Sequence, residues 1–87
     1  MRILVVEDEP KLAAVVQKGL EQKGYAVDTI GDGQEAFTRL TVHHADYDLV
    51  ILDLMLPSKS GKEICEEARA QGVTTPILVL TARNETE

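Results

Sequence analysis

Hydrophobic residues occur in three short continuous runs along the chain. The runs cover residues 3–6, 49–52 and 77–80, and each consists of valine, isoleucine and leucine without polar alternation. Continuous runs of this kind are typical of strands that are buried on both faces, as in a parallel sheet. A fourth segment, residues 26–30, includes the polar Asp28 and predicts an edge strand with one wetter face.

Three segments between these runs have helical patterns with start and stop signals. The first has Pro10 in its first turn and apolar residues at helical spacing, and it stops at Gly24. The second follows Asp32. The third begins at Ser60 with the sequence of a capping box and ends at Gly72. Strands and helices therefore alternate strictly, in the order βαβαβαβ.

This alternation predicts the α/β class, with a doubly wound parallel sheet, right-handed crossovers and helices on both faces. The length of 87 residues is enough for one small domain, which we assign to residues 1–87. In open sheets of this kind, ligands bind beyond the carboxyl ends of the strands. The residues that follow each apolar run are therefore the first candidates for a functional site.

Composition and charge exclude several classes of protein. With 44% hydrophobic and 28% charged residues, the chain has the composition of a folded globular protein. Its net charge of −6 repels a phosphate backbone, so we expect no direct contact with nucleic acid. No apolar stretch approaches the ~20 residues that span a bilayer, so we expect no membrane insertion. The single cysteine, Cys65, matches a reducing compartment, and we expect a cytoplasmic protein.

Acidic residues follow two of the predicted strands. Glu7 and Asp8 come directly after the first run, and Asp53 comes directly after residues 49–52. If these two strands are neighbours, the carboxylates converge, and their repulsion favours binding of a divalent cation. Mg²⁺ prefers such oxygen ligands, whereas zinc favours the histidine or cysteine ligands that are absent beside these acids. We therefore expect Mg²⁺ as the cofactor.

A purely structural interpretation of these acids is also open. Glu7 and Asp8 alone could form a solvated loop that favours the positive N-terminal end of the following helix. Asp53 weakens that interpretation, because an aspartate at the end of a wholly apolar strand is an unfavourable choice if only solubility is needed. The metal interpretation therefore depends chiefly on Asp53.

Four segments, in this order and spacing, resemble the receiver domains of bacterial two-component response regulators. They read VVEDE at residues 5–9, YDLVILDLMLP at residues 47–57, SG at residues 60–61 and TPILVLTAR at residues 75–83. The resemblance covers essentially the whole chain and is greatest to the subfamily in which a winged-helix DNA-binding domain follows the receiver. It implies a flavodoxin-like fold with the strand order 2-1-3-4.

The resemblance also implies a function. Asp53 would accept a phosphoryl group from the histidine of a sensor histidine kinase, in the presence of Mg²⁺, and so switch a transcriptional response. By the family pattern, Asp8 and Asp53 ligate the metal directly, Glu7 acts largely through water, and Met55 supplies its backbone carbonyl. Thr81 matches the hydroxyl that moves to bind the phosphoryl group. Such a chain is a signalling phosphoacceptor with self-catalysed phosphotransfer and slow autodephosphorylation, and is not an enzyme in the usual sense.

The chain departs from the family pattern after residue 87, where receivers continue through a further helix, strand and helix. We therefore expect a C-terminally truncated receiver that is impaired because it lacks the lysine of the fifth strand. Lys59 and Lys62 follow Asp53, and we expect them to be solvated and not to replace that lysine. The uncovered edge at residues 77–80 predicts a homodimer or an element-swapped oligomer, or a requirement for another chain.

Two other functions remain open at this point. An interaction or assembly module could keep the receiver architecture without being phosphorylated. A Mg²⁺-dependent phosphohydrolase would also use an aspartate nucleophile at a strand end, but such enzymes normally carry a second acid two positions later, where Met55 stands. A nucleotide-binding protein is disfavoured, because no glycine-rich phosphate loop follows the first strand.

Overall fold

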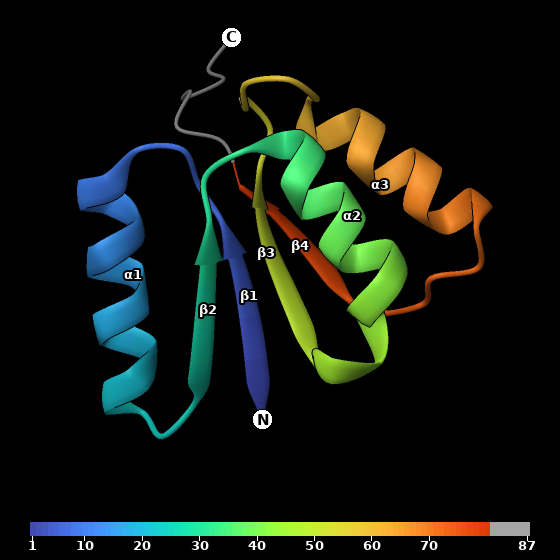
Figure 1. Cartoon of the computed structure of the whole chain (residues 1–87). Coiled ribbons are helices and arrows are strands. Elements are labelled where there is room, and N and C mark those ends of the chain that lie inside the picture. Colours follow the sequence, from blue (N-terminus) through green and yellow to red (C-terminus); the bar gives the residue numbers. More distant parts are fainter. Residues whose placement is uncertain (81–87) are drawn as a thin grey trace, which may run out of the picture.

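A parallel sheet forms the centre of the computed structural model, which describes residues 1–80 (Figure 1). The sheet has the order β2-β1-β3-β4, and each of its pairings is parallel. Its strands are β1 (Arg2–Val6), β2 (Ala26–Ile30), β3 (Leu49–Asp53) and β4 (Ile77–Leu80). The predicted α/β class and the strand order 2-1-3-4 are therefore confirmed.

The helices lie on both faces of the sheet, as predicted. Helix α1 (Pro10–Gln22) packs on one face, against β2 and β1, while α2 (Gly33–His43) and α3 (Gly61–Ala70) lie side by side on the other (Figure 1). A short 3₁₀ helix, His44–Asp46, leads from α2 towards β3 and was not predicted. Within residues 1–80, no helix is both long enough and apolar enough to cross a membrane.

The predicted start and stop signals all lie at helix ends. Pro10 is the first residue of α1, and the Asp32 side chain accepts a hydrogen bond from Glu35 N–H at the start of α2. Ser60 and Glu63 form the predicted capping box of α3. Caps of this kind satisfy amide groups that have no partner within the helix.

The apolar runs of β1 and β3 are continuous because both faces of these central strands pack against other residues, whereas most of the run in β4 is exposed in the described part of the chain. Successive side chains of a strand point to opposite faces, so β1 and β3 each supply residues to two separate clusters. The cluster under α2 and α3 includes Leu4, Val6, Val50 and Leu52, with Leu40 and Ile64 from the helices. The cluster under α1 includes Ile3, Val5, Val27 and Ile51. Each such side chain contributes about 1.5 to 3 kcal/mol when it is fully buried.

Asp28, the polar residue of the predicted edge strand β2, takes part in a network of hydrogen bonds. Its carboxylate accepts a hydrogen bond from the Tyr47 hydroxyl at 2.7 Å and from Arg2 Nη1 at 3.1 Å. Arg39 donates to the same Tyr47 hydroxyl at 2.9 Å. The hydrogen bond from Tyr47 is the first cause that lowers the pKa of Asp28 below its ordinary value, and the charges of both arginines act in the same direction. This network joins β2 to β1, α2 and the segment before β3.

Candidate functional site

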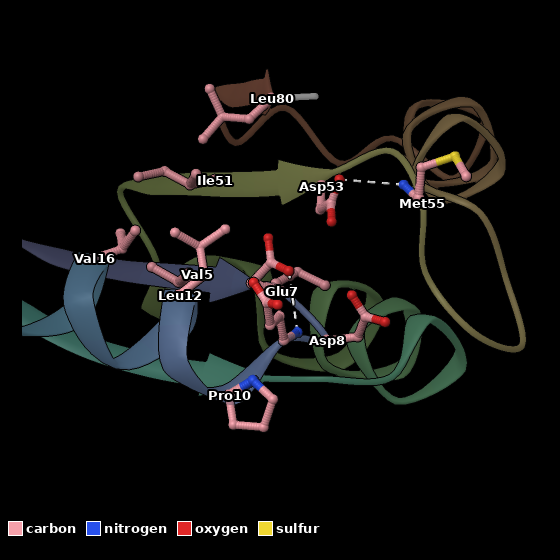
Figure 2. Close-up of a pocket in the computed structure, with 12 residues that line it drawn as sticks. Val5, Glu7, Asp8, Pro10, Leu12, Val16, Ile51, Asp53, Met55 and Leu80 are labelled. Atoms are coloured by element: carbon pink, nitrogen blue, oxygen red, sulfur yellow. Dashed lines mark hydrogen bonds between the residues drawn. The ribbon is translucent and has the colours of Figure 1, made fainter. Parts of the chain in front are cut away.

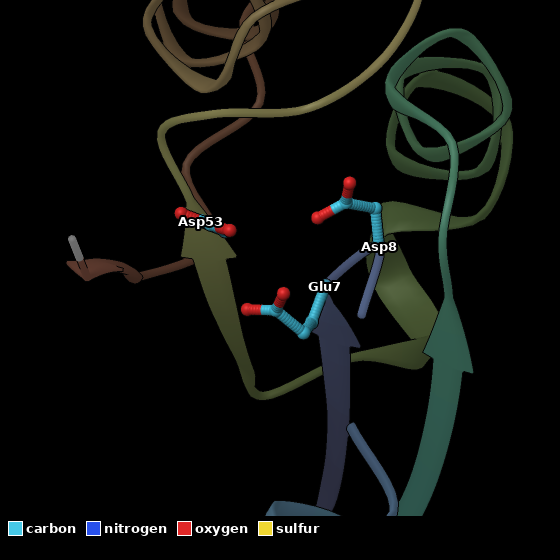
Figure 3. A group of neighbouring side chains, drawn as sticks. All are labelled: Glu7, Asp8 and Asp53. Carbon is cyan, nitrogen blue, oxygen red and sulfur yellow. The ribbon is translucent and has the colours of Figure 1, made fainter. Parts of the chain in front are cut away.

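The parallel register brings the ends of β1 and β3 to the same edge of the sheet. Val6 lies opposite Leu52, so Glu7 and Asp8 leave β1 at the level where Asp53 ends β3. One carboxylate oxygen from each of the three acids can be chosen so that all three lie within 4.8 Å of one another. Figure 3 shows the side chains of Glu7 and Asp8 turned towards the Asp53 side of this edge. We call these three residues the acid cluster.

Backbone hydrogen bonds hold both sides of the acid cluster in place. Glu7 N–H donates to the Ile30 carbonyl at 2.9 Å, which extends the β1–β2 pairing beyond the last residue of β1. On the other side, Leu54 N–H donates to the Leu80 carbonyl at 3.2 Å. Asp53 is the last residue of β3, whereas the sequence pattern predicted that it directly follows the strand. The sheet therefore holds Glu7 and Asp53, whereas Asp8 lies in the exposed bend that follows.

The acid cluster carries unbalanced negative charge. Partial burial is the first cause that raises the pKa of Glu7 above its ordinary value, and the hydrogen bond from Glu9 N–H opposes this. The negative charges of Asp53 and Asp8 raise the pKa of Glu7 further. None of the residues among 1–80 that line the adjoining cavity carries a positive side chain. Ionisation of Glu7 is therefore less favourable than usual, and a bound cation would offset this.

The donor set fits a hard divalent cation. It offers carboxylate oxygens that are partly accessible to solvent, together with space for water ligands. Mg²⁺ and similar ions bind through one or two carboxylates and keep several waters. The lining of the cavity within the described part of the chain includes no histidine or cysteine, so the set is poorly suited to zinc.

Met55 and Thr81 are the other predicted site residues. Met55 N–H donates to Asp53 Oδ1 at 3.3 Å, so the backbone of Met55 lies next to the acid cluster although its side chain is exposed. Thr81 lies outside the described residues. Lys62 is exposed, as expected.

Lys59 was expected to be solvated, and that prediction was wrong. Its side chain is only 15% exposed, because Nζ pairs with Glu67 Oε1 at 2.9 Å and lies 5.0 Å from the centre of the Phe37 ring. Both partners come from helices on the α2–α3 face. Lys59 is therefore tied to these helices and does not approach the acid cluster.

A cavity of about 680 Å³ opens beside the acid cluster, between α1 and the sheet (Figure 2). The acids and Met55 line one end of it. Apart from Glu9, the remaining wall is apolar, with side chains from four elements, chiefly Val5, Leu12, Val16, Ile51 and Leu80. The cavity was not predicted from the sequence. Leu12 belongs to the apolar stripe of α1 but is 41% exposed, because α1 packs over β2 and β1 and leaves the α1-side face of β3 and β4 uncovered.

Residues 3–87 match the family model described as "Response regulator receiver domain". The chain is similar to the transcriptional regulatory protein TcrA of Mycobacterium tuberculosis, with 51% identity over 83 residues, and to the response regulator ArlR of Staphylococcus aureus, with 47% identity over 85 residues. These alignments cover 95% and 98% of this chain but 32% and 37% of the relatives. The chain therefore spans about a third of the length of these curated relatives.

A solved structure is similar in fold and sequence. It is that of the response regulator protein TrrA from Thermotoga maritima in complex with Mg²⁺-BeF, with 40% identity and a TM-score of 0.85. The superposition covers 95% of this chain and 70% of that one. The fold, the order of the elements and the sequence similarity thus agree with one another.

The raised pKa of Glu7 predicts how stability depends on pH and on Mg²⁺. A carboxyl group with a raised pKa in the folded state removes stability as the pH rises above its ordinary value of 4.5. Without Mg²⁺ at neutral pH, Glu7→Gln should therefore raise the melting temperature by about 2 to 4 °C, which is roughly 0.5 kcal/mol after solvent screening. Added Mg²⁺ should stabilise the wild-type chain more than this variant.

Thermal unfolding followed by circular dichroism, with and without Mg²⁺, measures both effects. Glu66→Gln is the matched control, because Glu66 is exposed on α3, away from the acid cluster. A Glu7→Gln variant that is no more stable than the control, and that gains as much from Mg²⁺ as the wild type, would show that the three acids do not share a cation.

Proposed function

This chain belongs to the response regulator receiver domain family, and we propose that Asp53 accepts a phosphoryl group from a phosphohistidine of a sensor histidine kinase. One observation carries the proposal: oxygens of Asp53, Glu7 and Asp8 lie within 4.8 Å of one another at the carboxyl edge of the sheet. This arrangement offers a nucleophilic carboxylate and further acids that can help to hold a cation.

In the proposed step, a carboxylate oxygen of Asp53 attacks the phosphorus of the phosphohistidine. A new P–O bond forms as the P–N bond breaks, and the departing imidazole takes the bonding electron pair and a proton from solvent. The product on Asp53 is a mixed anhydride. Met55 N–H donates to Oδ1 of Asp53, which orients the carboxyl group and leaves Oδ2 for the attack. The chain contributes mainly position and charge, as is usual in phosphoryl transfer.

The cation expected at this site is Mg²⁺. Asp8 and Asp53 would ligate it directly, Glu7 would act largely through water, and Met55 would offer its backbone carbonyl. When bound, the metal neutralises charge on the carboxylates and on the transferred phosphoryl group. The structure of the related protein TrrA in complex with Mg²⁺-BeF supports Mg²⁺ as the cation. Thr81 remains the predicted switch hydroxyl.

The output of the signal is proposed from the relatives. TcrA is named as a transcriptional regulatory protein, and this chain corresponds to about a third of its length. We therefore propose that phosphorylation of Asp53 biases a surface that controls a transcriptional response. Phosphorylation changes the charge of one residue, and this change biases an equilibrium between conformations without substrate turnover.

We also propose that the edge of β4 associates with a second copy of this chain. Within residues 1–80, β4 ends the sheet on that side, and Leu78 and Leu80 are 49% and 47% exposed. These two side chains share the α1-side face with Ile51, which is the register partner of Leu78. An apolar strand with an unpaired edge is a template for pairing with another strand.

The phosphoacceptor proposal is tested by incubating the chain with Mg²⁺ and a small phosphodonor, followed by intact-mass spectrometry. The wild-type chain should gain one phosphoryl group, and Asp53→Asn should gain none because it lacks the nucleophilic oxygen. Asp46→Asn is the matched control and should behave as the wild type, because Asp46 lies in the 3₁₀ helix before β3.

Other outcomes identify the competing functions. Steady release of phosphate without an adduct would contradict the proposal and favour a phosphohydrolase. A wild-type chain that shows neither an adduct nor phosphate release would contradict it in favour of an interaction or assembly module. Equal labelling of Asp53→Asn would place the acceptor elsewhere.

Self-association is tested by sedimentation velocity over a range of protein concentrations. The wild-type chain should shift from monomer to a larger species as concentration rises, and Leu78→Lys should weaken that shift by placing a charge at the edge. Val42→Lys is the control, because Val42 is 65% exposed on α2, away from β4. A wild-type chain that stays monomeric throughout, or a Leu78→Lys variant that associates equally well, would contradict the proposal.

A further inference from the structure

The loop between β3 and α3, residues 54–60, contains a turn with an unusual backbone conformation. Ser58 has φ 71°, a left-handed conformation that favours glycine. Lys59 N–H donates to the Pro57 carbonyl at 2.8 Å and closes a three-residue turn around Ser58. A non-glycine residue keeps such a conformation only when its surroundings hold it there.

The side chain of Ser58 is held by the residue that begins α2. Ser58 Oγ donates to Asp32 Oδ1 at 2.6 Å, while Asp32 Oδ2 accepts Glu35 N–H at 2.9 Å. One carboxylate therefore caps α2 and binds the loop at the same time. The two hydrogen bonds lower the pKa of Asp32 below its ordinary value, the bond from Ser58 being the first cause, so the carboxylate is ionised at neutral pH.

Close backbone contacts complete the attachment of the loop. Gly33 N–H donates to the Pro57 carbonyl at 3.1 Å, and a Cβ at Gly33 would overlap the Lys59 carbonyl oxygen. At the base of the loop, Gly61 N–H donates to the Leu54 carbonyl at 3.0 Å. A Cβ at Gly61 would overlap the carbonyl oxygen of Asp53. The loop is therefore fixed both to α2 and to the residue that carries the proposed nucleophile.

Lys59 anchors the other side of the strained turn. Its ion pair with Glu67 and its position over Phe37 hold the residue that directly follows Ser58 against α3 and α2. Ser58 thus lies between two neighbours that are held in place: the Pro57 carbonyl accepts a hydrogen bond from Gly33 N–H, and Lys59 forms an ion pair with Glu67. The Ser58 hydroxyl donates a side-chain hydrogen bond to Asp32, the residue that caps α2.

We propose that the hydrogen bond from Ser58 to Asp32 is a latch that positions the β3–α3 loop, and with it the backbone of Met55, at the acid cluster. Ser58 and Asp32 are then positioning residues for the cation and for phosphoryl acceptance. This inference rests on the proposed function above. The loop leaves Asp53 and returns to it at Gly61, so the conformation of the loop sets the direction of the backbone at Met55, two residues beyond Asp53. Release of the hydroxyl lets Ser58 relax and loosens that backbone.

The test uses the full chain and three substitutions of Ser58. Ser58→Ala removes the hydroxyl, and Ser58→Gly removes it together with the backbone strain. Ser58→Asn offers an amide donor on a residue that tolerates this conformation, and should restore the latch. Thr41→Ala is the control, because its hydroxyl is exposed on α2 and bonds only the Thr38 carbonyl.

The first measurement is amide hydrogen exchange by NMR. Ser58→Ala and Ser58→Gly should speed exchange at Gly33 and Gly61 by about tenfold, because their amides bond the loop. Exchange at Val73, whose amide bonds Ala68 at the far end of α3, should not change. The second measurement is the Mg²⁺ dissociation constant, which should rise by about tenfold in both variants.

Each outcome decides between the latch and the function on which it rests. Unchanged exchange at Gly33 and Gly61 in Ser58→Gly would overturn the latch, whatever the phosphorylation result. Faster exchange with unchanged Mg²⁺ affinity would overturn the positioning role. If Ser58→Ala and Ser58→Gly weaken Mg²⁺ binding as expected but the wild-type chain forms no adduct on Asp53, the proposed function alone would be refuted.

Discussion

The convergence of three carboxylates at one edge of a parallel sheet is the constraint on which the rest of the site depends. In a parallel sheet, neighbouring strands end at the same edge, so Glu7 and Asp8 necessarily lie beside Asp53 once β1 pairs with β3. Hydrogen bonds from Glu7 N–H to Ile30 and from Leu54 N–H to Leu80 fix the backbone on either side of the site to the outer strands β2 and β4. Partial burial, together with the negative charges of Asp53 and Asp8, raises the pKa of Glu7, and the gathered carboxylates make the edge a candidate site for a cation.

The groups that oppose folding lie near this edge of the sheet, whereas the stabilising apolar contacts lie between the sheet and the helices. Burial of both faces of the sheet supplies the hydrophobic stabilisation, through clusters under α1 and under α2 and α3. The crowded acids and the left-handed Ser58 oppose it locally. Strained or mutually repelling groups persist only where surrounding structure holds them, and they are common at functional sites. The attachment of the β3–α3 loop to Asp32 and Gly33 provides such support.

The strands and helices could be predicted because their signals are local. Continuous apolar runs mark the strands, although only those of β1 and β3 are buried on both faces and the run of β4 is mostly exposed. Asp32 and Ser60 mark helix starts by their own side chains. The pairing of β1 with β3 is not a local property, and it was predicted from the family resemblance. Lys59 was misjudged because its partners, Phe37 and Glu67, meet it only after two helices pack. The cavity was missed for a similar reason, since it depends on where α1 lies across the sheet.

The most direct test of the central claim is the position of a bound divalent cation. Mn²⁺ accepts the same oxygen ligands as Mg²⁺ and scatters X-rays anomalously, so a crystal of the chain grown with Mn²⁺ locates the ion independently of its ligands. We expect one strong anomalous peak between the carboxylates of Asp8 and Asp53, with Glu7 turned towards it. A strong peak elsewhere, with these side chains directed away from one another, would contradict it.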